Sequence, residues 1–345
     1  MIDIKILVDD KTIIQPRHLG LRKTVNPEAD SFDFEIENTR DRYTDIFYQT
    51  TGERTAIELQ GILQFKGLCD SCEFHYFPES IIFAQGRDYT GLLIDEIITP
   101  TLSAKFSGKT ASQIVETIAK QYGFKYDITR TTKTGFDEHL YSPGTPVWSA
   151  VAELAQKHNF DAYITKEGIL IFKERKLSTE VKRVFSFDKK FGTVPTFLHF
   201  AQDKTDSLAL KLEVIGYDPK AKKRISYLAE SPLRNRDNYK ILTETRLDLI
   251  TKSDLRLYAE ARLKQYSKDL VTGHLLIPGD PELEPSDCIE FKEMKMSNRY
   301  YITEVIHNVS VNGFTTELDF ASKEFTEART QELEFLKPQK PFSFP

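Results

Sequence analysis

With 345 residues, 40% of them hydrophobic and 29% charged, the chain has the length and composition of an ordinary globular protein of two or three domains. Its formal net charge of −5 provides no basic footprint for duplex nucleic acid, so we predict no specific nucleic-acid binding. The start of the sequence lacks a signal-peptide pattern, and no apolar run approaches membrane-spanning length. We therefore expect synthesis in the cytoplasm and no membrane anchor. Three cysteines do not make a disulfide framework in so long a chain.

Residues 1–100 consist of short segments with strand patterning. The segments 5–8 and 12–14 flank Asp9-Asp10, which is a hairpin signal. Residues 31–37 alternate apolar and polar side chains, as a half-buried strand does. Similar segments follow at 56–59, 63–66, 73–77 and 81–84. Short strands at this spacing predict a first small β-barrel or sandwich.

A two-helix α/β domain is predicted for residues 101–176. Thr110 and Gln113 form a capping-box pattern at the start of an apolar helical stripe. The stripe ends at Gly123, where a left-handed conformation would terminate the helix. Residues 124–129 then alternate as a strand does.

The same pattern is repeated with a second helix and two strands. Thr145-Pro146 predicts an N-cap followed by a proline in the first turn, and Asn159 predicts the helix end. Trp148, the only tryptophan, lies on the apolar face and is expected to be a core residue. Strand patterns at 160–165 and 169–172 complete an αβαββ order of elements.

Residues 177–322 return to strand patterning and are expected to form a second small β-barrel. A long alternating strand at 206–217 turns back into 224–228. A helical insertion is predicted near 251–269, with Ser253 as its N-cap. The remaining segment, 323–345, is predicted to form a helix over 325–336 and a short proline-containing tail.

The two β regions resemble each other in the order of their strand patterns. Strand patterns at 57–59 and 81–83 resemble those at 289–291 and 316–320 in order and spacing. One interpretation is two copies of one barrel; the other is the general likeness of alternating strands. The fold class is in either case α+β and mostly β.

Cys69 and Cys72, followed by His75, form the motif that is most similar to a redox or metal site. A redox dithiol requires a helix N-terminus at its first cysteine, whereas the residues that follow Cys72 have strand patterning. A zinc site would require a fourth ligand, and the sequence contains no second CxxC or HxxxH pair. We therefore interpret the motif as two strand cysteines and predict no metal and no cofactor.

No pattern of catalytic residues was found in the sequence. Seven histidines are scattered without a recognisable catalytic setting. A thiol-protease pair of Cys288 and His307 is conceivable, but no local pattern supports it. The basic run at 220–224 is most simply a solvated hairpin end. We therefore predict no catalytic residues and no enzyme activity.

Several short motifs, in their order along the chain, resemble one known family. These are Gly86-Arg87-Asp88, Gly108-Lys109-Thr110-Ala111, Tyr122-Gly123-Phe124, the run 148–155, the turn 166–172, the run 300–307 and the run 313–318. Over roughly residues 1–322 the sequence resembles the tail hub family of phages and contractile injection systems. That family includes late control D-type proteins, the baseplate hubs of large myophages and the tail-associated proteins of siphophages.

The resemblance implies a structural role in a virion tail tip or baseplate. It implies a homotrimer in which each chain contributes two similar barrels, so that the six barrels form a ring that continues the hexameric tail tube. The implied partners are the tail tube or distal tail protein, a tip or spike protein, and the tape-measure protein that passes through the channel with DNA. Two alternatives stay open: a tail-associated cell-wall peptidase or lysin component, and a host carbohydrate-binding module.

In such a ring the first barrel of one subunit is expected to meet the second barrel of its neighbour. Exposed edge strands are the natural contact because a neighbouring strand can cover their unpaired backbone groups. The strands around Ile57, Leu59, Ile289 and Phe291 are therefore candidate near-interface elements.

Overall fold

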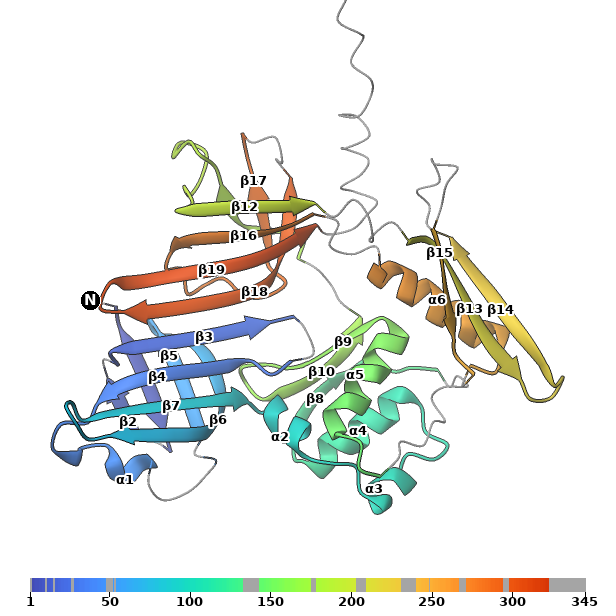
Figure 1. The fold of residues 1–345 in the computed structure, drawn as a ribbon, viewed down its shortest axis with the longest axis horizontal. Helices are drawn as coiled ribbons and strands as arrows, with labels where there is room; N and C mark the ends of the chain where they lie inside the picture. Colours follow the sequence, from blue (N-terminus) through green and yellow to red (C-terminus); the bar gives the residue numbers. More distant parts are fainter. Residues whose placement is uncertain are drawn as a thin grey trace, which may run out of the picture.

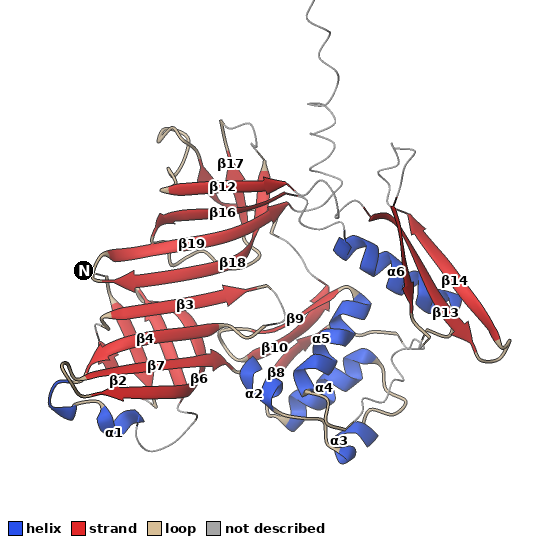
Figure 2. Cartoon of the chain, viewed as in Figure 1, coloured by secondary structure: helices blue, strands red, loops and turns tan. Residues whose placement is uncertain are grey.

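We analysed a computed structural model of the full chain. The residues it describes are 2–9, 11–14, 16–25, 28–47, 52, 54–132, 143–174, 178–202, 209–230, 240–247, 249–266, 271–293 and 298–322. Strands outnumber helices (Figure 2), which confirms the predicted α+β, mostly β class. Among these residues no helix is both long and apolar enough to cross a membrane.

A single 13-stranded sheet contains strands from both predicted β regions (Figure 1). Its first half contains β1 (Ile4–Val8), β2 (Lys11–Ile14), β3 (His18–Thr24), β4 (Ser31–Glu37), β5 (Arg54–Leu59), β6 (Ile62–His75) and β7 (Ile81–Asp88), with the short helices η1 (Thr39–Asp41) and α1 (Thr44–Phe47). Its second half contains β11 (Val181–Phe185), β12 (Phe197–Gln202), β16 (Val271–Pro278), β17 (Cys288–Phe291), β18 (Arg299–Ser310) and β19 (Gly313–Ser322). Antiparallel pairing of β3 with β18 joins the two halves. Among the described strands, neither half closes into a separate barrel.

Each half has its own hydrophobic core. Strand β4 shows how the sequence produces it: Phe32, Phe34 and Ile36 are buried, and the residues between them face outward. This two-residue period is the alternation expected of a strand with one buried face. In the second half, Phe291, Tyr300 and other aromatic residues pack edge to face.

The two halves repeat one strand order. In the first half the order across the sheet is β5-β6-β7-β4-β3, and in the second it is β17-β18-β19-β16-β12. Both series run through the chain in the same way, because each consists of two early strands followed by a three-strand meander. All pairings within both series are antiparallel. The strands of the repeat suggested by the sequence therefore occupy equivalent positions.

The two-helix unit follows β7, and from α4 onward it has the predicted αβαββ order. Its elements are α2 (Thr90–Asp95), α3 (Pro100–Ala104), α4 (Ala111–Gln121), β8 (Lys125–Ile128), α5 (Val147–His158), β9 (Phe160–Ile164) and β10 (Ile169–Glu174). The strands form a separate sheet in the order β8-β10-β9, with β8 parallel to β10. Helices α4 and α5 cover this sheet and share a core with it.

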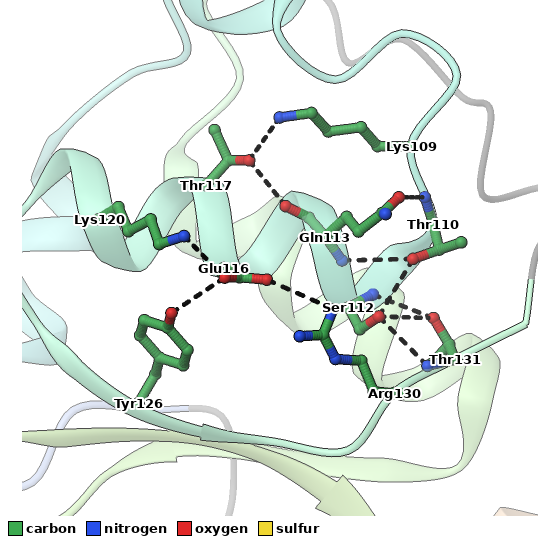
Figure 3. A network of polar contacts seen from close by, with 10 residues as sticks. All are labelled: Lys109, Thr110, Ser112, Gln113, Glu116, Thr117, Lys120, Tyr126, Arg130 and Thr131. Atoms are coloured by element: carbon green, nitrogen blue, oxygen red, sulfur yellow. Dashed lines mark hydrogen bonds and ion pairs between the residues drawn. The ribbon is translucent and has the colours of Figure 1, made fainter.

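The N-terminus of α4 is held by the predicted capping box (Figure 3). The Thr110 hydroxyl accepts a hydrogen bond from the Gln113 N–H, and the Gln113 side chain accepts one from the Thr110 N–H at 2.9 Å. Further along the helix, Glu116 accepts hydrogen bonds from Lys120 at 2.7 Å and from the Tyr126 hydroxyl of β8 at 2.9 Å. These contacts lower the pKa of Glu116 and connect the helix to its sheet.

A second α/β unit is inserted in the second half of the large sheet. It contains β13 (Ala209–Asp218), β14 (Lys223–Glu230), β15 (Lys240–Thr245) and α6 (Lys252–Tyr266). The strands form a sheet of their own in the order β14-β13-β15, and α6 packs on β13 and β14 and also contacts α5. The insertion predicted as a helix near 251–269 therefore includes these three strands as well, so they are not part of a second barrel.

Three of the predicted helix ends lie within the described residues. The α6 N-cap is Thr251, whose hydroxyl accepts a hydrogen bond from Asp254 N–H at 3.1 Å; Ser253 lies within the helix. Pro146 is itself the N-cap of α5, without a side-chain cap from Thr145. The predicted helix end at Asn159 is confirmed by its left-handed φ of 55°. The helix predicted over 325–336 lies outside the described residues.

Replacement of Trp148 tests the packing of α5, because the Trp148 side chain is only 4% exposed. We expect Trp148→Ala to lower the free energy of unfolding by about 3–5 kcal/mol, since the loss of a large buried ring leaves a cavity. Leu247→Ala is the control because Leu247 is 62% exposed, and it should cost less than about 0.5 kcal/mol. Urea titration of both variants measures the difference, and similar small losses would contradict a core role for Trp148.

Candidate functional site

Glu284 links three parts of the molecule through its two carboxylate oxygens. One oxygen lies 2.8 Å from Lys23 Nζ on β3, and the other lies 2.8 Å from Lys166 Nζ in the turn between β9 and β10. Glu284 itself belongs to the loop between β16 and β17. One carboxylate therefore connects the first half of the large sheet, its second half and the two-helix unit.

The Lys23 ammonium group is buried at this junction, with its side chain only 4% exposed. It donates a second hydrogen bond, of 2.8 Å, to the Gln64 side-chain oxygen on β6. The Gln64 amide in turn donates to the Pro281 carbonyl at 2.9 Å. Burial lowers the pKa of Lys23, and the neighbouring Glu284 carboxylate opposes that shift.

A cavity of about 240 Å³ adjoins this junction. Asp30 lines it and accepts a hydrogen bond from the Thr24 N–H at 2.9 Å. Burial raises the pKa of Asp30 to about 7, despite that hydrogen bond and the Lys23 charge. Asp88, whose N–H donates to the Asp30 carbonyl, is also buried, and its pKa is likewise raised.

Two arginines hold neighbouring elements together at the surface. Arg22 of β3 forms a two-pronged pair with Glu304 of β18, at 2.8 and 3.0 Å, across the seam between the halves. Arg87 pairs with both Asp70 of β6 and Asp95 of α2, at 2.6 and 2.7 Å. The Arg87-Asp88 sequence thus has a structural role, because it attaches the first half to the two-helix unit.

An open groove of about 950 Å³ lies between α5 and β9 on one side and the second half of the large sheet on the other. His274 lines it and contacts Asp319 through Nδ1 at 2.8 Å. Among the described residues, no group of three histidine, cysteine or acidic side chains is arranged to hold a metal ion.

The cysteine motif lies on a strand, as interpreted from the sequence. Cys69 and Cys72 belong to β6 and are not joined in a disulfide. Cys69 is buried, and its sulfur contacts the carbonyls of Ser71 and Gln85. His75 faces Glu73 and the Phe83 ring.

The Cys288–His307 pair is not formed. Cys288 lies opposite Tyr301 in the β17–β18 ladder, and six residues of strand, about 20 Å, separate Tyr301 from His307. His307 is fully buried, its ring contacts the Thr316 hydroxyl at 3.0 Å, and burial lowers its pKa to about 3. It is therefore a neutral core residue.

The candidate interface residues are core residues in this fold. Ile57, Leu59, Ile289 and Phe291 are each at most 1% exposed. Their strands are not edges, because β5 pairs with β1 and β6, and β17 pairs with β11 and β18. Within the chain these side chains point inward, because the hydrophobic alternation that made the strands recognisable also places them on the buried face. A contact of their strands with a neighbouring chain stays a prediction. Among the described strands, the sheet ends instead at β12, β2 and β11, each of which pairs with a single strand.

No protein-family model and no curated relative matches the chain by sequence. A tail protein from Neisseria meningitidis MC58 is similar in structure, with a TM-score of 0.76 and 15% identity over 93% of this chain and 97% of that one. The 43 kDa tail protein of prophage MuSo2 from Shewanella oneidensis has a TM-score of 0.72 and 13% identity over 93% and 98%. The chain has the fold of phage tail proteins. The resemblance found in the sequence is confirmed at this level.

A third similar structure belongs to a secretion system. The E. coli c3393 protein, a component of the type VI secretion system with structural similarity to the T4 tail proteins gp27 and gp5, has a TM-score of 0.55. It is 10% identical over 95% of this chain and 78% of that one.

Loss of the Glu284 charge tests the junction. We expect Glu284→Gln to lower the free energy of unfolding by about 1–3 kcal/mol, because the buried Lys23 ammonium loses its counter-ion. Glu282→Gln is the control, since Glu282 forms exposed pairs nearby and should cost less than about 1 kcal/mol. Denaturant titration measures the free energy of unfolding of both variants. Equal stability of the two would contradict the role of Glu284 in holding the junction.

Asp30 predicts a pH dependence of stability. Its pKa in the folded protein, about 7, lies above its ordinary value of 3.8, so protonation favours the folded state. Its stabilising contribution is full below about pH 4 and is lost as the pH rises through 7. Asp30→Asn should flatten this decline, whereas Asp45→Asn on exposed α1 should not. Urea titrations from acidic to neutral pH measure the slope, and an unchanged slope in Asp30→Asn would contradict the assignment.

Proposed function

We propose that this chain is a structural hub of a phage or phage-like tail, located at the tail tip or baseplate of the virion. The observation that carries the proposal is the likeness to two tail proteins over nearly their whole lengths and nearly all of this chain. In this role the chain joins a hexameric tail tube to a trimeric tip or spike and forms part of the channel for DNA and the tape-measure protein.

The repeated strand order supports a ring of three chains. A six-fold tube presents six equivalent contacts, and three chains with two similar halves each can match them. The two halves have equivalent strand orders and separate hydrophobic cores, as two barrel-like units would. The similarity of the c3393 protein to T4 gp27 and gp5, stated for that protein, is consistent with the same role.

The junction at Glu284 suits a rigid structural part. A hub that transmits load between tube and tip has to keep the two-helix unit fixed against the sheet. The Lys23–Glu284–Lys166 bridge and the Arg87 pairs provide such fixed contacts between units. The peptidase alternative receives no support from Cys288 and His307, which lie far apart along paired strands.

The solution mass tests the hub directly. We expect the purified protein to sediment at about three times its chain mass of 39.8 kDa, or to be a monomer that trimerises only with its tube or tip partner. Three copies are expected because two halves in each chain then match six positions. A stable dimer or tetramer without a central channel, seen by sedimentation and electron microscopy, would contradict the proposal.

A further inference from the structure

The turn between β13 and β14 concentrates positive charge at one end of the inserted α/β unit. Lys220, Lys222, Lys223 and Arg224 lie within five residues of sequence, and all four are exposed. None of the four forms an ion pair with another residue that the structure describes. Figure 1 shows the turn at the end of the unit that points away from the large sheet and the two-helix unit. In a chain of net charge −5, this turn is a local reversal of sign.

Hydrogen bonds to the backbone hold this turn in one shape. The Asp218 carboxylate accepts a hydrogen bond from the Lys220 N–H at 2.8 Å and another from the Ala221 N–H at 3.0 Å. These bonds lower the pKa of Asp218, and the nearby Lys223 and Lys220 charges lower it further. The four cations line neither the groove nor the cavity described above. They therefore form an exposed, convex tip.

Apolar side chains are exposed at the same end of the unit. The Tyr217 N–H donates to the Leu249 carbonyl at 3.3 Å, which places the segment after β15 beside the end of β13. In that segment Leu247 is 62% exposed and Ile250 is 40% exposed, and Tyr217 itself is 37% exposed. Lys252, the first residue of α6, adds a fifth exposed cation. Positive charge and apolar surface thus occur together.

We propose that this end of the inserted unit binds a membrane surface that contains anionic lipids. The basic end, as we call it, consists of the cations at 220–224 together with Tyr217, Leu247 and Ile250. Its lysine and arginine side chains contact the lipid phosphates, and its apolar side chains enter the headgroup layer. This contact goes beyond the proposed role between a tube and a tip, and it does not depend on that role.

The combination of residues favours a lipid surface over other anionic partners. Peripheral proteins bind membranes through electrostatic attraction to anionic lipids together with burial of apolar side chains. Tyrosine is enriched at membrane–water interfaces, because its ring is apolar and its hydroxyl is polar. A single nucleic-acid strand is held instead in a positively charged groove with aromatic side chains for its bases, whereas the basic end is a convex tip.

Vesicle binding tests the basic end on the full-length protein. The protein should sediment with phosphatidylcholine vesicles that contain about one third phosphatidylglycerol, because these carry negative charge. It should not sediment with vesicles of phosphatidylcholine alone. Added salt should release the protein, since exposed charges are screened. Failure to bind the charged vesicles at low salt would overturn the proposal.

Two matched pairs of lysines locate the binding surface. Lys220→Gln with Lys222→Gln should weaken binding to the charged vesicles about tenfold or more, because each lysine near an anionic surface contributes about fivefold. Lys189→Gln with Lys190→Gln removes the same charge from exposed lysines before β12 and should weaken binding less than about twofold. Lys220→Arg with Lys222→Arg keeps the charges and should bind as the unchanged chain does. Equal weakening by the two glutamine pairs, with unchanged circular dichroism spectra, would overturn the assignment to this end.

A tryptophan reporter tests the apolar part of the basic end. Tyr217→Trp places an indole beside the cations, while the natural Trp148 is buried and contributes a constant background. The emission of Tyr217→Trp should shift to the blue with the charged vesicles, because the indole leaves water. Phe77→Trp, at an exposed position after β6, is the control and should show no shift. An unchanged spectrum of vesicle-bound Tyr217→Trp would overturn the contact through this end.

The same assay separates the lipid surface from two other anionic partners. If a single-stranded oligonucleotide or polyglutamate binds the chain while the charged vesicles do not, the cations serve a nucleic acid or an acidic protein and the lipid contact is overturned. Failure of the hub proposal is a different result. A protein that binds charged vesicles without forming a trimer would contradict the hub and leave the lipid contact standing.

Discussion

The pairing of β3 with β18 is the constraint on which the rest of the architecture depends. It joins strands almost three hundred residues apart in the sequence and converts two separate β regions into one sheet. Arg22 and Glu304 reinforce it with two parallel hydrogen bonds. Because the pairing consists of backbone hydrogen bonds in a fixed register, it sets the direction and offset of one half against the other. The Glu284 bridge and the Arg87 pairs connect further elements to the sheet that this pairing forms.

The Glu284 junction attaches the two-helix unit to this sheet. A carboxylate that accepts from two lysines offsets their charge repulsion, and Gln64 satisfies another donor of the more buried one. Breaking such a cluster leaves an unpaired buried charge, which costs far more than the loss of an exposed pair. The two-helix unit is thereby held against the sheet by directed contacts. The proposed role between a tube and a tip would require a fixed geometry of this kind.

Local elements were predictable where their signals are local. The capping box of α4, the αL end of α5 at Asn159 and the alternation of β4 depend on residues a few positions apart, and the structure contains each of them. The N-cap of α6 was misplaced by two residues, because Thr251 and Ser253 are equally able to cap and only the backbone geometry decides between them. The sequence predicted strands before α6 but assigned them to the wrong sheet, since the alternation of apolar and polar residues does not indicate which strands pair with each other.

The sequence by itself determined the α+β class, the two-helix unit, the strand character of the cysteine motif and the resemblance to tail hubs, all from short-range patterns. Only the tertiary structure decided which strands are edges, that Ile57 and Phe291 are core residues, and that Lys23, Lys166 and Glu284 meet. The physical reason is that strand alternation reports which face is buried, whereas edges and buried ion pairs depend on which distant segments pair. Register and strand order arise from those long-range pairings, and no local pattern encodes them.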